Sequence, residues 1–288
     1  MLKALRDRIR VYLPEKYRTP APVVPVVRLS GVIGAGSSFR PGLNLASVAG
    51  PLQKAFSHED APAVAILINS PGGSPVQSNL IFKRIRQLAE EKEKTVLVFV
   101  EDVAASGGYF IAVAGDEIIA DPSSVVGSIG VISSGFGLTK AIGKLGVERR
   151  VYTSGKSKST LDPFMPEKKE DVAHLKQLQE EIHETFIDVV KSRRGDVLKE
   201  DDETLFNGLF WTGKTALSMG LIDGIGDLSS TVKERFGEKT KLKVIDTKKG
   251  FSMRRLFGGA IDETAISRIG DGIIGSVEER AHWARFGL

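Results

Sequence analysis

Small residues flank Ser106 on both sides, where the chain reads Ala-Ala-Ser-Gly-Gly. An apolar, strand-like stretch (95–100) precedes this run, and a helix-like stretch (109–114) follows it. A strand, a sharp turn and a helix in this order present a hydroxyl at a helix N-terminus, where backbone N–H groups stabilise developing negative charge. Gly107 and Gly108 allow a substrate carbonyl to approach the backbone closely. The pattern favours Ser106 as a nucleophile, although a serine among small residues also occurs in plain turns and helix caps.

A second turn with two glycines, Ser-Pro-Gly-Gly at residues 70–73, follows a short and wholly apolar run at 63–68. Such a run is typical of a strand that is buried on both faces. Gly72 and Gly73 can turn a backbone N–H toward a ligand, which would supply half of an oxyanion hole. Taken alone, the same four residues are equally compatible with an ordinary turn.

The chain has no cysteine, which excludes a thiolate nucleophile, a disulfide framework and a cysteine-based zinc site. None of its histidines has metal-ligand spacing, and we expect them to be solvated surface residues. They are His58, His174, His183 and His282.

The candidate base for Ser106 is therefore a lysine in the polar loop 152–164, which contains Lys156 and Lys158. A lysine serves as a general base when burial disfavours its charged form, and a Ser–Lys dyad is an accepted variant of the catalytic triad. The two lysines are two residues apart, so an extended loop would point them the same way. A lone lysine in a polar loop is otherwise simply solvated.

Apolar, strand-like runs alternate with helical patterns along most of the chain, which predicts an α/β fold with a mostly parallel sheet flanked by helices. The expected strands are 23–29, 63–68, 95–100, 117–120, 125–132, 148–152 and 241–245. The expected helices are 45–56, 76–92, 109–114, 139–145, 166–193, 212–223 and 227–236.

Three of these segments together resemble the signal peptide peptidase A family, also called protease IV, which belongs to the ClpP/crotonase fold superfamily of repeated β-β-α units. The matching motifs occur in the family's order: Ser-Pro-Gly-Gly at 70–73, Ala-Ala-Ser-Gly-Gly-Tyr around Ser106, and Gly-Lys-Ser-Lys-Ser before Asp-Pro-Phe. Ser106 and Lys158 are 52 residues apart, as in single-repeat bacterial members. The resemblance covers roughly residues 23–240, and its motifs are jointly specific.

The resemblance also assigns roles. Its alignment on Ser-x-x-Asp-Pro-Phe favours Lys158 over Lys156 as the general base. A fourth match, Val-Gly-Ser-Ile-Gly-Val, implies that Ser128 hydrogen-bonds and orients that base, although a plain strand-end serine remains open. Lys158 would take the Ser106 proton while the N–H groups of Gly107 and of Gly72 or Gly73 hold the oxyanion. No metal or cofactor is needed, and activity should rise toward alkaline pH.

The family further implies that serine and lysine can come from neighbouring protomers, so we expect a ring-like homo-oligomer. The implied substrates are extended apolar peptides, such as released signal peptides, bound by strand addition. Two other functions stay open. A crotonase-like enzyme would use the same N–H groups on an acyl-CoA thioester, and a catalytically silent ring would serve as a scaffold.

The composition is that of an ordinary globular protein, with 288 residues, 41% hydrophobic residues and a net charge of +4. Because basic and acidic residues are interspersed, we expect no nucleic-acid partner. We expect an N-terminal basic helix and Pro-rich linker (1–22), a peptidase domain (23–247) and a C-terminal extension (248–288). Family members typically carry an N-terminal membrane anchor. Here residues 2–13 instead predict at most a weak peripheral membrane contact, so we expect a protein that is cytoplasmic or peripheral to the inner membrane face.

Overall fold

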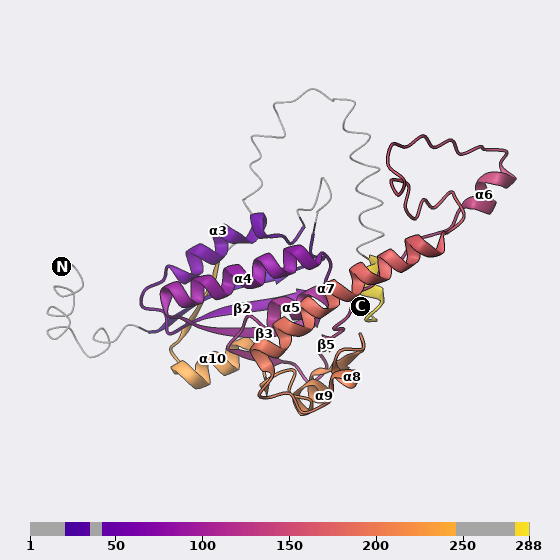
Figure 1. Cartoon of the computed structure of the whole chain (residues 1–288). Helices are drawn as coiled ribbons and strands as arrows, with labels where there is room; N and C mark the ends of the chain where they lie inside the picture. Colours follow the sequence, from indigo (N-terminus) through magenta and orange to yellow (C-terminus); the bar gives the residue numbers. More distant parts are fainter. Residues whose placement is uncertain (1–20, 35–41, 246–279, 288) are drawn as a thin grey trace, which may run out of the picture.

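The computed structural model describes residues 21–34, 42–245 and 280–287 (Figure 1). The predicted helix at 2–13 lies outside the described residues, as does most of the predicted extension at 248–288. The expected domain limits at residues 22 and 247 therefore stay predictions.

The described residues contain one sheet of eight strands, with helices packed against it. The strands are β1 (Val23–Ser30), β2 (Ala63–Ser70), β3 (Thr95–Ala105), β4 (Glu117–Ala120), β5 (Val125–Gly127), β6 (Phe210–Thr212), β7 (Gly224–Ile225) and β8 (Lys241–Ile245). The helices are α3 (Leu45–Phe56), α4 (Pro75–Lys92), α5 (Gly107–Ala112), α6 (Thr139–Lys144), α7 (Lys169–Arg194), α8 (Asp202–Leu205), α9 (Gly213–Ser218) and α10 (Leu228–Phe236).

The main path of the sheet runs β6-β5-β3-β2-β1-β8, and β4 joins β3 to β7. Every pair is parallel except β5 with β6, so the predicted α/β fold with a mostly parallel sheet is confirmed. Parallel strands share one direction, and their carboxyl ends therefore meet at one edge of the sheet. The turns after β2 and β3, which carry the two glycine-rich motifs, follow neighbouring strands at that edge.

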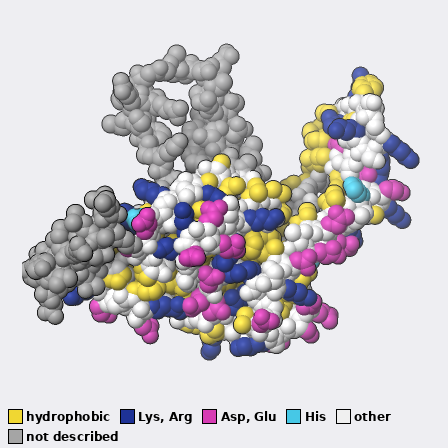
Figure 2. Space-filling model, turned by 60° about the vertical axis from the view of Figure 1, so that its left-hand side comes forward, with side chains coloured by type: hydrophobic (Ala, Val, Ile, Leu, Met, Phe, Trp, Pro, Cys, Tyr) yellow, Lys and Arg dark blue, Asp and Glu magenta, His cyan; other side chains and the backbone are white. Residues whose placement is uncertain are grey.

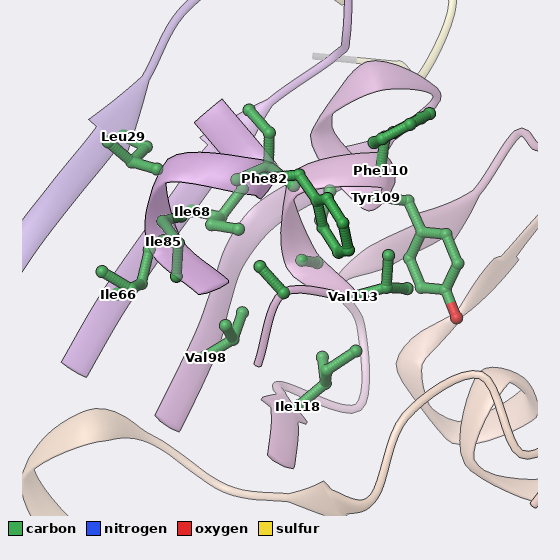
Figure 3. Close-up of a cluster of buried hydrophobic side chains, with 14 of the residues drawn as sticks. Leu29, Ile66, Ile68, Phe82, Ile85, Val98, Tyr109, Phe110, Val113 and Ile118 are labelled. Atoms are coloured by element: carbon green, nitrogen blue, oxygen red, sulfur yellow. The ribbon is translucent and has the colours of Figure 1, made fainter. Parts of the chain in front are cut away.

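Alternate residues of the strands face two hydrophobic cores. The larger core lies between the sheet and the helices α3, α4, α5 and α7, and Figure 3 shows part of it around Phe82, Tyr109 and Phe110. The ring of Phe110 lies 5.9 Å from that of Phe82 and 4.9 Å from that of Phe186 on α7. The smaller core packs β1, β2 and β3 against Val232 of α10. The short α5, which follows Ser106, is thus buried beneath two longer helices.

Three expected strands differ from the structure. The strand predicted at 95–100 continues to residue 105 and ends directly before Ser106. The strand predicted at 125–132 ends at Gly127, because Gly127 and Ser128 both have positive φ angles (110° and 53°) that an extended strand does not adopt. The strand predicted at 148–152 is wrong. Arg149 in that stretch forms an ion pair with Asp162, and none of the described strands pairs with residues 148–152.

Residues 131–168, which include α6, form an excursion that we call the arm. Figure 1 shows the arm projecting from the sheet beyond the first turns of α7. None of its residues is buried in this single chain. The arm therefore has no core of its own in this single chain.

Candidate active site

The turn after β2 is held against the segment that follows β1. The N–H of Ile33 donates to the carbonyl of Gly72 (2.8 Å), and the N–H of Ser74 donates to the carbonyl of Ile33 (2.7 Å). Gly72 and Gly73 have φ angles of 103° and 141°, which side chains rarely allow. A Cβ on Gly73 would lie 2.0 Å from the Ile33 carbonyl oxygen, so this position admits only glycine.

Ser106 occupies the sharp turn that the sequence predicts. Its backbone, with φ 52° and ψ −122°, lies outside the regions that non-glycine residues favour. The residue is half-buried, and its hydroxyl makes no capping hydrogen bond to α5. Its N–H donates to the carbonyl of Gly127 (2.8 Å), which fixes the turn while leaving the side chain unengaged. A strained serine at a strand-to-helix turn is the arrangement that presents a nucleophile.

The two glycine turns interlock. A Cβ on Gly72 would lie 2.8 Å from Cβ of Ser106 and 2.9 Å from the backbone nitrogen of Gly107. A Cβ on Gly107 would lie 3.3 Å from the backbone nitrogen of Gly73. The backbone nitrogens of Gly73 and Gly107 are therefore close neighbours beside Ser106, and within the described chain neither donates a hydrogen bond. Two adjacent free N–H groups next to a nucleophile suit an oxyanion.

Gly72 and Gly73 differ in whether the backbone N–H group is free to bind a ligand. The N–H of Gly72 already donates to Oγ of Ser70 (3.2 Å), and that hydroxyl donates to the carbonyl of Gly31 (2.7 Å). Gly73 is therefore the better donor for a ligand, while Gly72 provides the space that Ser106 occupies.

Ser128 lies beside the nucleophile turn. β5 pairs with the last residues of β3, with Ala105 opposite Gly127, and Ser128 is the next residue along. Ser128 is 6% exposed, has a φ of 53°, and its N–H donates to the carbonyl of Leu209 (2.7 Å). The structure thus brings together Ser106, Ser128 and the glycines at 72, 73 and 107.

The two lysines are placed differently. Lys156 and Lys158 are both exposed, and both belong to the arm. The shallow hollow that Lys158 lines is formed only by residues between Arg149 and Phe164, so its other walls also belong to the arm. Within the described residues, no hydrogen bond or ion pair joins the side chain of either lysine to Ser106 or Ser128, and Figure 1 shows the arm projecting away from the sheet.

Several residues near the site were not singled out from the sequence. The side chain of Asn69 contacts Asp102, and that of Ser124 contacts the backbone of β3. His183, which we expected to be a solvated surface residue, is half-buried and places Nε2 3.1 Å from the carbonyl of Ile129, next to Ser128. No local sequence pattern could have revealed these contacts, because the partners are 33 residues apart for Asn69 and 54 residues apart for His183.

In the part of the chain that the structure describes, no three His, Cys, Asp or Glu side chains converge as metal ligands would. Among the described helices, none combines the length and the apolar character needed to cross a membrane.

Comparison with known proteins identifies relatives along most of the chain. The chain is 56% identical over 292 residues to a Brucella abortus protein named Na(+)/H(+) antiporter NhaA, an alignment that covers 99% of this chain and 40% of that protein. It is 30% identical over 241 residues to the putative protease slr0021 of Synechocystis, covering 82% of this chain and 84% of that protein. It is 36% identical over 171 residues to the chloroplastic serine protease SPPA of Arabidopsis thaliana, covering 59% and 25%.

The chain thus spans about two fifths of the Brucella protein's length and a quarter of the Arabidopsis protein's length. The family model described as peptidase family S49 matches residues 88–243, which contain Ser106, Ser128 and Lys158. That match covers more than half of the 288 residues, and the Synechocystis relative is aligned over most of its own length. The chain therefore belongs to peptidase family S49.

Proposed function

We propose that this chain is a serine peptidase in which Ser106 is the nucleophile and Lys158 of a second copy is the general base. Family membership supports the peptidase activity. The observation that carries the residue roles is the pair of free N–H groups, on Gly73 and Gly107, next to a strained and uncapped Ser106.

The proposed reaction uses only groups of the protein, the peptide and water. Neutral Nζ of Lys158 takes the proton from Oγ of Ser106 as Oγ bonds to the peptide carbonyl carbon. The carbonyl oxygen becomes an oxyanion, held by the N–H groups of Gly73 and Gly107. The lysine then gives its proton to the leaving amine as the C–N bond breaks, and water hydrolyses the acyl-enzyme with the same lysine as base.

The exposed arm is the reason for proposing that two copies of the chain share one active site. Lys158 lies on an excursion without buried residues, while Ser106 and Ser128 lie on the sheet. The arm also exposes large apolar side chains, including Phe136 (85% exposed) and Tyr152 (91% exposed). Figure 2 shows hydrophobic side chains on this projection interspersed with basic ones. Packing the arm on a neighbour would cover those side chains and exclude water from Lys158, which favours its neutral form.

The substrates that fit this site are extended, apolar peptides, such as released signal peptides. Leu209, whose carbonyl accepts the Ser128 N–H, exposes 58% of its surface, and Phe210 beside it exposes 43%. These side chains provide an apolar surface near the nucleophile, and the arm of a neighbour would add another. A ring of copies would carry such sites at each interface.

The decisive test mixes two inactive variants, Ser106→Ala and Lys158→Ala, before assaying a quenched apolar peptide. Each variant alone should be inactive. In a mixed assembly, an interface that joins the intact serine of one variant to the intact lysine of the other is active, so an equimolar mixture should regain about a quarter of wild-type activity. Lys156→Ala serves as the matched control and should remain active.

Three outcomes would contradict the proposal. If both variants are inactive and no mixture regains activity, serine and lysine do not come from different copies. If Lys158→Ala keeps full activity while Lys156→Ala is inactive, the base is Lys156. A wild-type protein that cleaves no peptide but binds an acyl-CoA would support the crotonase-like function instead.

A further inference from the structure

The strand that leads to Ser106 is not regular. Ile68 of β2 pairs with Val100 of β3, whereas Ser70 pairs with Ala104. Two steps along β2 therefore correspond to four steps along β3, so β3 carries a bulge at residues 101–103. A bulge bends its strand, increases the local twist, and redirects the side chains that follow.

At the bulge, β3 also changes its neighbouring strand on the side opposite β2. Before it, Val100 pairs with Ala120 of β4, and from its last residue on, β3 pairs with β5, with Val103 opposite Val125. The three residues after the bulge end at Ser106 and pair with the segment that ends at Ser128. The shape of the bulge therefore determines where the nucleophile turn lies relative to β2, whose own turn carries the oxyanion donors.

One buried side chain spans the bulge from β2. Nδ2 of Asn69 donates to Oδ2 of Asp102 (2.6 Å), and Oδ1 of Asn69 accepts the N–H of Val103 (3.3 Å). Asn69 is 8% exposed and is the β2 residue that faces the irregular pairing. Its amide thus replaces the ladder hydrogen bonds that the bulge interrupts.

A second side chain supports the bulge from the opposite side. Oγ of Ser124, which is 2% exposed, donates to the carbonyl of Glu101. Asn69 of β2 and Ser124, in the turn directly before β5, therefore hold the same irregular segment from its two sides. Neither has a hydrogen-bond partner in the helices, and neither belongs to the proposed dyad.

We infer that Asn69 is a positioning residue, which acts through the Asp102 bulge to align Ser106 with the N–H groups of Gly73 and Gly107. This inference rests on the proposed function, because it assigns Asn69 to the same nucleophile. Misplacing reacting groups by about 1 Å can reduce a rate by about 10²-fold, so a change at Asn69 should act on kcat. Asn69 does not contact the peptide in this arrangement, and KM should therefore change little.

The test exchanges the amide of Asn69 and the carboxylate of Asp102, first singly and then together. Asn69→Asp keeps the acceptor for Val103 but places a carboxylate against that of Asp102, and kcat should fall by about tenfold or more with KM within about twofold. Asp102→Asn keeps an acceptor for the Asn69 amide and should lose at most a factor of about two. The double variant restores a donor–acceptor pair with the roles reversed, and kcat should return to within about threefold of wild type.

A matched control makes the same chemical change elsewhere. Gln87→Glu also replaces an amide that donates to a carboxylate, here that of Glu91, on the exposed surface of α4 (2.8 Å). It should leave kcat unchanged. Circular dichroism and thermal melting of each variant give the folded fraction, to which kcat is normalised.

The inference would be overturned if Asn69→Asp kept wild-type kcat per folded molecule, because its role would then be purely structural. It would also be overturned if the double variant remained as slow as Asn69→Asp. Failure of the proposed function is distinguishable: wild type would then be no more active than Ser106→Ala, whatever the state of Asn69.

Discussion

The backbone N–H of Ser106 donates a 2.8 Å hydrogen bond to the carbonyl of Gly127, the residue directly before Ser128. This bond continues the parallel pairing of β3 with β5 by one residue beyond the Ala105–Gly127 pair. Ser106 and Ser128 then both adopt positive φ angles, of 52° and 53°. The two strands therefore end at the same level, and a lysine that reaches Ser106 from another copy would meet Ser128 beside it.

Because Gly72 packs closely against Ser106, Gly72→Ala should inactivate the protein without unfolding it. The added Cβ would lie 2.8 Å from Cβ of Ser106 and 2.9 Å from the nitrogen of Gly107, on a backbone with a φ of 103°. Either the nucleophile or an oxyanion donor has to move, and loss of one such donor typically costs about 10²- to 10³-fold in kcat. Peptide hydrolysis by the purified variant measures the effect.

Gly50→Ala is the matched control, because no atom lies within 4 Å of its added Cβ in α3. It should leave kcat unchanged and stabilise the fold by up to about 1 kcal/mol. Wild-type kcat in Gly72→Ala would show that the two turns are not as tightly interlocked as described.

If copies of the chain contact one another through the arm, as we propose, Phe136→Asp should separate them. Phe136 is 85% exposed on the arm, so a charge there costs the single copy little but opposes burial against a neighbour. We expect sedimentation to show smaller species and peptide hydrolysis to fall by at least about tenfold, since each site would lack its lysine.

The control for the arm is Val244→Asp, which introduces the same charge at a 70% exposed position on the edge strand β8. Its sedimentation and activity should match those of wild type. If Phe136→Asp remained fully assembled and active, the arm would not be the contact between copies.

The proposed base predicts that kcat/KM rises toward alkaline pH, because a lysine must lose its proton before it can accept that of Ser106. Lys158→Arg should be inactive across the range, since a guanidinium stays protonated. His183→Gln keeps a donor for the Ile129 carbonyl and should not change the profile. A flat or acid-shifted profile would argue against the lysine.

The sequence predicted the elements and motifs that are local in the chain. The helix at 45–56 and the strands at 117–120 and 241–245 occur with the predicted bounds, because propensity and hydrophobic periodicity specify them. The Ser106 turn was predictable for the same reason: its glycines and its flanking strand and helix are contiguous in the chain.

Features that depend on register were not predictable. The bulge opposite Asn69 exists because β3 exchanges β4 for β5, and no local pattern records that exchange. The run at 148–152 has the β-branched and aromatic residues of a strand, yet no strand pairs with it. Propensity alone does not make a strand where no partner strand is available.

The ion pair between the buried Arg194 and the partly exposed Asp223 should contribute to stability. Arg194 is 5% exposed and donates two hydrogen bonds to the Asp223 carboxylate (3.0 and 2.9 Å) and one to the Gly220 carbonyl (2.9 Å). Arg194→Met would remove these three hydrogen bonds, and because the Asp223 carboxylate keeps contact with water, we expect a loss of about 1.5–3 kcal/mol. Urea unfolding at neutral pH measures the loss.

Lys191→Met is the control, because Lys191, on the same helix as Arg194, forms an exposed ion pair with Asp202 of α8. Removing such a pair should cost at most about 1 kcal/mol. Equal losses for the two variants would show that burial does not distinguish these ion pairs.

The carboxylate at the start of α10 should make the stability of the fold depend on pH in acid. Oδ1 of Asp227 accepts the N–H groups of Ser229 (2.8 Å) and Ser230 (3.0 Å), and the backbone hydrogen bond from Ser230 is the main cause that lowers the pKa of Asp227. A group whose pKa is lower in the folded state stabilises the protein above its unfolded pKa. That contribution is lost as the pH falls through the folded pKa.

Asp227→Ala should therefore lose about 1 kcal/mol at neutral pH, the usual value of an N-cap. The difference from wild type should shrink in acid, as Asp227 of the wild type becomes protonated. Asp227→Asn keeps the oxygen that caps the helix but does not titrate, so its stability should stay nearer to that of wild type at neutral pH. Thermal melting of the three proteins from neutral pH into acid tests this, and a difference between Asp227→Ala and wild type that persists unchanged below the pKa of Asp227 would show that the charge contributes nothing to the cap.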